Sequence, residues 1–217
     1  MHEANPSSHP EVLQFLADDF VAHQFDLRHL IRSIANSRVY QLSNRYPFAG
    51  KRPEEETFAC SMVRPLSGQQ LAVSMLVAAG YYDTLKSGAD VKTRSDPGAL
   101  RAKLEAQHAA TLAGLVKNLD SGGDPYQPGI REALYEANSF AFADFVAKGG
   151  LPARLASMKG DVPMLQEAFL CVLSRLSSPI EAERLRGYLQ ERAERRQASC
   201  EQIVWVLVTS AEFRFNH

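Results

Sequence analysis

Helix-start signals followed by apolar residues at helical spacing recur along nearly the whole chain of 217 residues. One such signal is the capping box, in which a serine caps the start of the helix and the side chain of a glutamate or glutamine three positions later accepts a hydrogen bond from the backbone N–H of that serine. This pattern begins at Ser8, Ser67 and Ser178. Only residues 203–208 are rich in β-formers, and a single strand would have no partner in a sheet. We therefore interpret that run as a helix and predict an all-α fold.

We expect an irregular bundle of about eight helices without a significant sheet. Asp26 and Asp96 provide two further N-caps. The expected helices start at or near residues 8, 26, 67, 96, 130, 163, 178 and 199. The stretch 71–79 is apolar nearly all round, so the helix that starts at Ser67 should be central. The helix at 130–146 should be interrupted near Asn138, and the longest irregular segments should be 43–64 and 81–97.

Composition limits the class of protein. The chain is 45% hydrophobic and 23% charged, which is typical of a soluble globular protein. We expect a single helical domain over 1–217, with a possible subdivision near the polar, glycine-rich stretch at 120–129. A net charge of −1 argues against nucleic-acid binding, and no apolar run is long enough for a transmembrane helix. The first residues do not read as a signal peptide.

Motifs that carry chemistry are absent from the sequence. It contains no C-x-x-C-H, H-E-x-x-H, Walker A, G-x-G-x-x-G or G-x-S-x-G segment. The three cysteines are far apart, and the six histidines show no close helical pairing. Glu132 and Glu136 lack the histidines that a di-iron bundle needs. We therefore expect no metal site, no cofactor in this chain and no assigned catalytic residue, so an enzyme is not the favoured reading.

The best candidate for a binding site is a polar cluster near the start of the chain. Arg28 and Arg32 are one turn apart on an expected helix, opposite its apolar face, and Arg38, Tyr40 and Gln41 follow directly. Guanidinium groups bind carboxylate, sulfate or phosphate in a bidentate manner, so this cluster is a candidate site for an anion or an acidic sugar.

A structural role for the same arginines is favoured over the binding role. Arginines four residues apart on an amphipathic helix usually form a solvated face. They could also pair with Asp18 and Asp19 on the preceding helix. Similarly, Tyr81 and Tyr82 could line a carbohydrate groove, but a hydrophobic plug at a helix end is the favoured reading.

Several segments together resemble a known family. Residues 5–13 read N-P-S-S-H-P-E-V-L, residues 26–34 read D-L-R-H-L-I-R-S-I, and residues 37–41 read S-R-V-Y-Q. Further segments at 64–71, 128–139 and 170–183 and the W-V-L, S-A-E-F and N-H ending over 205–217 continue the series. The ordered motifs resemble the planctomycete domain-of-unknown-function family 1553 over nearly the whole chain. Where that family usually has R-P-P, this chain has Arg175 followed by Leu-Ser-Ser-Pro.

The resemblance implies a setting but no activity. Family members normally carry more chain before the N-P-x-S-H-P-E segment, often with a sister domain and sometimes with a cytochrome c-like haem module. The chain therefore resembles the C-terminal part of a larger architecture. A protein partner or an upstream domain is then expected, and the cell envelope or periplasm is the implied location.

Three hypotheses about function remain open. The first and favoured one is a non-catalytic interaction or structural module of a cell-envelope multi-domain protein. The second is an enzyme or binding protein for anionic or carbohydrate ligands that uses the arginine cluster. The third is a truncated remnant whose missing upstream segment would complete the fold, and it is compatible with either of the others.

Overall fold

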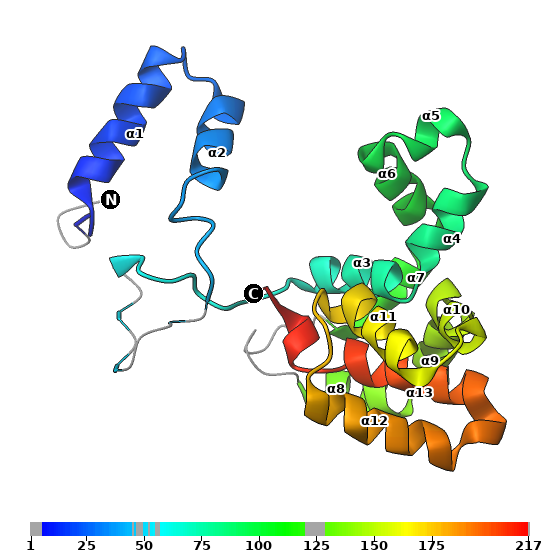
Figure 1. Ribbon diagram of the computed structural model, residues 1–217. Coiled ribbons are helices and arrows are strands. Elements are labelled where there is room, and N and C mark those ends of the chain that lie inside the picture. Colours follow the sequence, from blue (N-terminus) through cyan, green and yellow to red (C-terminus); the bar gives the residue numbers. More distant parts are fainter. Residues whose placement is uncertain are drawn as a thin grey trace. The chain divides into compact units, whose positions relative to one another are not determined.

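The computed structural model describes residues 6–44, 46, 50–51, 53–54, 57–119 and 129–216. These residues form 13 α-helices, so the prediction of an all-α protein is confirmed (Figure 1). The chain divides into two compact units, residues 1–64 and residues 65–216. The subdivision expected near 120–129 falls on residues 120–128, which lie outside the described part of the chain, and stays a prediction.

The first unit contains a helical hairpin of α1 (Pro10–Ala22) and α2 (Leu27–Ala35). The turn between the two helices places Gln24 and Phe25 in the left-handed region, with φ of 55° and 62°. Asp26 then caps α2 as predicted, because its side chain accepts hydrogen bonds from the backbone N–H groups of Arg28 and His29.

The cap predicted at Ser8 is wrong. The N-cap of α1 is His9, and no side chain caps the first turn. The fixed φ of Pro10 suits the first helical position, so the helix starts at that proline and the cap position falls one residue after the serine.

The second unit contains the remaining helices. They are α3 (Gly68–Ala78), α4 (Tyr81–Gly88), α5 (Val91–Arg94), α6 (Pro97–Gln107), α7 (Ala109–Leu119), α8 (Ile130–Asn138), α9 (Phe140–Lys148), α10 (Gly150–Ser157), α11 (Asp161–Leu173), α12 (Pro179–Glu191) and α13 (Arg196–Val208). Two 3₁₀ turns, η2 (Ala193–Arg195) and η3 (Glu212–Arg214), and two strands of two residues each, β1 (Arg64–Pro65) and β2 (Phe215–Asn216), complete the elements. None of the helices in the described part of the chain has the length and apolar character that a bilayer span requires.

The core of the second unit forms around α3, as the sequence predicted. Met75 and Leu76 of α3 are fully buried, and α3 packs along α7. The capping box at Ser67 is present, and so is the one at Ser178 at the start of α12. The ambiguous run at 203–208 is helical, because Ile203 and Val204 of α13 pack into the same core.

Other boundaries differ from the expected ones. The segment 81–97, expected to be irregular, contains α4 and α5, and Asp90 caps the second of these. The helix expected to start near residue 96 ends at Gln107, and a separate helix, α7, follows after His108. Residues 150–157 form the unexpected helix α10. Ser199, expected to cap the last helix, is buried inside α13, because that helix already begins at Arg196.

The corner between α3 and α4 touches the corner between α9 and α10 through the backbone. The N–H of Leu151 donates a hydrogen bond of 2.9 Å to the carbonyl of Ala79. A Cβ on Gly149 would lie 2.2 Å from the same carbonyl oxygen, and a Cβ on Gly80 would lie 2.4 Å from the Leu151 nitrogen. These glycines therefore do more than end helices, because they let two helix corners meet without side chains between them.

Two arginines tie the C-terminal turns to the rest of the second unit. Arg175 donates to both carboxylate oxygens of Glu181 at 2.8 and 2.9 Å and to both of Glu212 at 2.6 and 2.7 Å. Arg214 of η3 pairs with Glu132 and, at 2.7 Å, with Glu136 of α8. The Arg175 pairing gives the arginine of the altered R-P-P segment a structural role.

Candidate functional site

The polar cluster predicted from the sequence lies on α2 and in the turns that follow it. Arg28, Arg32, Arg38, Tyr40 and Gln41 are all exposed. Arg28 and Arg32 are four residues apart and therefore share one face of α2. No carboxylate in the described part of the chain forms an ion pair with Arg28, Arg32 or Arg38.

The carboxylates considered as structural partners of these arginines are engaged elsewhere. Asp18 accepts a hydrogen bond of 2.9 Å from the Gln14 amide. Asp19 contacts His23 at 3.3 Å and His29 at 3.1 Å. The Asp19–His29 contact therefore joins α1 to α2, and neither aspartate neutralises the guanidinium groups.

Two members of the cluster shape the turn after α2. The Gln41 side chain donates to the carbonyl of Ala35 at 3.3 Å, and the N–H of Tyr40 donates to the hydroxyl of Ser37 at 3.2 Å. Tyr40 as a whole residue is 66% exposed. The Gln41 side chain is thus used in a hydrogen bond to the backbone, whereas the side chains of Tyr40 and the three arginines are exposed to solvent.

The apolar face of α2 is also exposed. Leu27, Leu30, Ile31 and Ile34 occur at i, i+3, i+4 and i+7, and we call these four residues the α2 stripe. Leu27 and Ile31 are 59% and 57% exposed, and no residue of α1 or α2 is buried. By contrast, an apolar stripe in the second unit, such as that of α11, is mostly buried.

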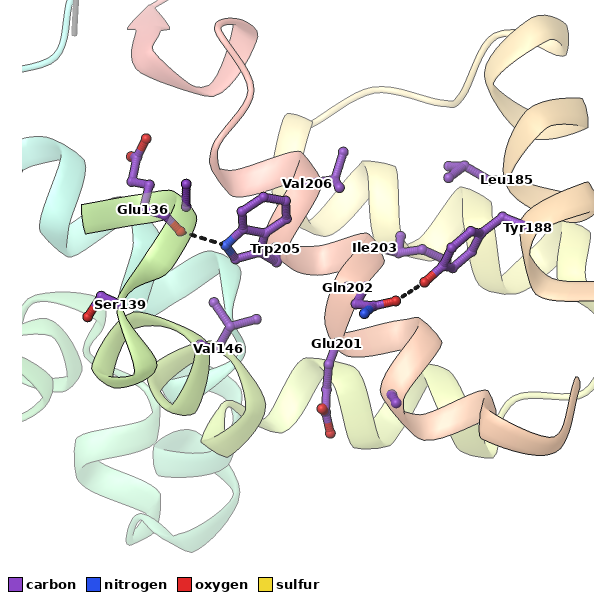
Figure 2. A pocket seen from close by; sticks show the side chains of 13 residues that line it. Glu136, Ser139, Val146, Leu185, Tyr188, Glu201, Gln202, Ile203, Trp205 and Val206 are labelled. Carbon is purple, nitrogen blue, oxygen red and sulfur yellow. Dashed lines mark hydrogen bonds between the residues drawn. The ribbon is translucent and has the colours of Figure 1, made fainter. Parts of the chain in front are cut away.

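A cavity of about 600 Å³ lies in the second unit among α8, α9, α12 and α13. Figure 2 shows side chains that line it. This volume is in the range of small-molecule sites. Apolar side chains and the rings of Tyr188 and Trp205 form most of its wall. The polar groups at the cavity are Glu136, Ser139, Glu201 and Gln202. The sequence did not reveal this cavity because its lining residues are spread from 136 to 206.

The polar groups at the cavity mainly hold the helices together. The indole N–H of Trp205 donates to the carbonyl of Glu136 at 3.0 Å, and the Tyr188 hydroxyl donates to the Gln202 side chain. Figure 2 shows the carboxylates of Glu136 and Glu201 pointing away from each other. A catalytic acid and base must both reach the reacting group of a bound substrate, and the Glu136 carboxylate points away from the cavity.

The environment of Glu136 explains why its carboxylate turns away from the cavity. Burial raises the pKa of Glu136, and the neighbouring Arg214 guanidinium opposes this by lowering it. The ion pair with Arg214, at 2.7 Å, compensates the removal of the carboxylate from water. Glu136 is therefore a structural residue of the second unit.

Tyr81 has the structural role that the sequence favoured. Its hydroxyl donates to the carbonyl of Phe145 at 2.8 Å, and its ring stacks on that of Phe145 at 5.4 Å. Burial is the main cause that raises the pKa of Tyr81. The ring thus fills the space between α4 and α9.

Comparison with known proteins yields one match. The sequence model of the family described as "Protein of unknown function (DUF1553)" matches residues 2–116. No curated protein and no solved structure shows a significant match. The matched segment includes the α1–α2 hairpin and ends within α7, whereas the residues that line the cavity lie beyond it.

Proposed function

This chain belongs to the DUF1553 family of proteins of unknown function, and from that premise we propose that it is a non-catalytic protein-interaction module. The observation that carries the proposal is the exposed α2 stripe, within the segment that matches the family. The implied partner is a neighbouring protein domain of the cell envelope, the setting that the family resemblance suggests.

The spacing of the α2 stripe suits the docking of a helix into an apolar groove. Recognition of this kind uses anchor side chains at i, i+3, i+4 and i+7, which are the positions of the four stripe residues. Three stripe residues, Leu27, Ile31 and Ile34, are exposed. Covering them contributes roughly 3 kcal/mol to the free energy of binding. The opposite face of α2 carries Arg28 and Arg32, which can remain in water when the stripe is covered.

Glutamate at Leu27 and Ile31 should leave the stability of the isolated chain nearly unchanged while removing its docking surface. Both side chains are more than half exposed, and surface substitutions usually change stability by less than about 0.5 kcal/mol. We expect the melting temperature of Leu27→Glu/Ile31→Glu to stay within about 2 °C of the parent chain, measured by circular dichroism. Amide hydrogen exchange over α1 and α2 should be fast in both proteins.

The matched control is Leu76→Glu in α3, where the leucine is fully buried and a charge should unfold the second unit. A fall of several degrees for the α2 variant, with slow exchange over α2 in the parent chain, would show that this chain covers the stripe itself. Light scattering then identifies the occupant. If the parent chain is a dimer and the double substitution makes it monomeric, a second copy of the chain covers the α2 stripe. If the parent chain is a monomer, the partner of the stripe is a different protein.

Anion binding is a second candidate function, favoured by the lack of carboxylate partners for Arg28, Arg32 and Arg38 within the part of the chain that is described. Guanidinium groups that are not neutralised internally bind sulfate and carboxylate through paired N–H donors. The nearby exposed ring of Tyr40 offers a flat surface to a sugar. The ligand class is therefore a sulfated or otherwise acidic oligosaccharide.

Alanine at Arg28 and Arg32 should abolish the binding of a sulfated oligosaccharide without lowering the melting temperature, because both side chains are exposed and neither pairs with a carboxylate among the described residues. Isothermal titration of the parent chain and of Arg28→Ala/Arg32→Ala measures this. Arg101→Ala is the control, since Arg101 is exposed on α6 and pairs with Glu105. A parent chain that gives no heat at millimolar ligand, or a variant that loses stability and keeps its binding, rules out the anion site.

A further inference from the structure

Two imidazoles and a carboxylate meet where α1 turns into α2. Asp19 lies in the last turns of α1, His23 is the C-cap of that helix, and His29 lies in the first turn of α2. One ligating atom from each of the three lies within 4.8 Å of the others. We propose that Asp19, His23 and His29 form a binding site for a divalent transition-metal ion, with zinc as the ion that the ligand set fits best.

The distances from Asp19 to the two imidazoles are close to ligand–ligand distances in a zinc site, with a different carboxylate oxygen facing each ring. Two ligand atoms that each lie about 2 Å from a tetrahedral ion are about 3.3 Å apart. Asp19 Oδ1 lies 3.3 Å from His23 Nδ1, and Asp19 Oδ2 lies 3.1 Å from His29 Nε2. Two histidines and one carboxylate are also a donor set that zinc uses when one position is left for water or another ligand.

Binding requires a small movement of the two rings. The imidazoles are stacked with their centroids 3.6 Å apart and their planes 16° from parallel, so their in-plane lone pairs do not converge. The His23 and His29 side chains are 47% and 30% exposed, and the terminal torsion of histidine is broad, so each ring can rotate toward a shared ion. His23 would also give up the 2.9 Å contact between its Nδ1 and the carbonyl of Asp19.

A bound ion would stabilise the turn between α1 and α2. Its turn holds two consecutive non-glycine residues, Gln24 and Phe25, at positive φ, which is a conformation of raised energy. Neither helix contributes a buried residue that would offset this cost. An ion that joins the last turns of α1 to the first turn of α2 would stabilise the turn directly, because metal binding to a folded site adds to folding free energy.

Titration of zinc into the metal-stripped full chain, after removal of any affinity tag, tests the proposal. We expect one zinc ion per chain and slower amide hydrogen exchange over α1 and α2 when zinc is present. His23→Gln/His29→Gln and Asp19→Asn should each weaken zinc binding by at least about tenfold, since even an outer-shell partner of a metal is worth about that much.

The control variant is His108→Gln, because His108 lies between α6 and α7 and outside the cluster. It should bind zinc as the parent chain does. Circular dichroism of the metal-free variants checks that they are folded, which we expect because the buried core lies in the second unit and not in the hairpin. A parent chain that binds no zinc, or cluster variants that bind it as tightly as the parent, would overturn the proposal. Neither outcome bears on the α2 stripe, because the test of the stripe depends on Leu27 and Ile31 and can be run on the same metal-stripped chain.

Discussion

Replacing Gly149 with alanine is expected to lower the melting temperature of the chain by about 6–12 °C. The new Cβ would lie 2.2 Å from the carbonyl oxygen of Ala79 and 2.9 Å from the Ala79 Cβ, so the two helix corners must move apart. Such overpacking typically costs about 1–3 kcal/mol. The loss of the 2.9 Å hydrogen bond from Leu151 to Ala79 adds about 1 kcal/mol.

The same substitution elsewhere in the second unit should have the opposite sign. Gly114 in α7 and Gly187 in α12 are helical, and a Cβ at either position meets no atom within 4 Å. Alanine there should stabilise the chain by about 0.5–1 kcal/mol, because glycine is the poorer helix former. Thermal unfolding followed by circular dichroism compares the three variants. A melting temperature of Gly149→Ala as high as those of the two control variants would mean that the backbone contact between the two helix corners does not exist.

Replacing Arg214 with methionine is expected to destabilise the chain by about 3–5 kcal/mol at pH 7, because it leaves buried carboxylates without their partner. Arg214 pairs with Glu132 and Glu136, and both glutamates are buried. Urea unfolding followed by tryptophan fluorescence measures the loss, since Trp205 donates to the carbonyl of Glu136. Arg101→Ala is the comparison, because an exposed pair within one helix contributes less than about 1 kcal/mol.

The deficit of Arg214→Met should shrink as the pH falls. Burial raises the pKa of Glu136, and Arg214 is the main influence that lowers it, so this pKa rises further when the arginine is removed. A folded-state pKa above the unfolded value means that the folded chain binds protons more readily, and its stability then decreases as the pH rises. The loss should thus be smaller at pH 5 than at pH 7, and Glu132→Gln/Glu136→Gln should rescue part of it. A pH-independent loss would mean that packing, not the unpaired charge, is responsible.

Local features of this protein could be predicted from the sequence to the residue. The capping boxes at Ser67 and Ser178 and the N-caps at Asp26 and Asp96 are present as expected. A cap depends on hydrogen bonds among four consecutive residues, so the pattern and the structure it forms lie in the same short segment. The cap at Ser8 was wrong because a local competitor, Pro10, set the start of the helix.

The candidate sites depended on the structure to different degrees. The arginine cluster on α2 could be found from spacing alone, because its members are neighbours on one helix and the turns after it. The cavity beside Trp205 could not be found in that way, because its lining comes from four helices. The meeting of His23 and His29 was also missed, since their spacing of six residues is not a helical one and only the left-handed turn at Gln24 and Phe25 brings the rings together.

The sequence by itself determined the all-α class, most helix starts and the family to which the chain belongs, because periodicity, caps and ordered motifs are properties of adjacent residues. Only the tertiary structure decided that two helix corners meet at Gly149, that Glu136 pairs with Arg214, and that α1 leaves the α2 stripe uncovered. Each of these depends on which distant residues approach, or fail to approach, a given side chain, and packing free energy arises from those contacts rather than from local patterns.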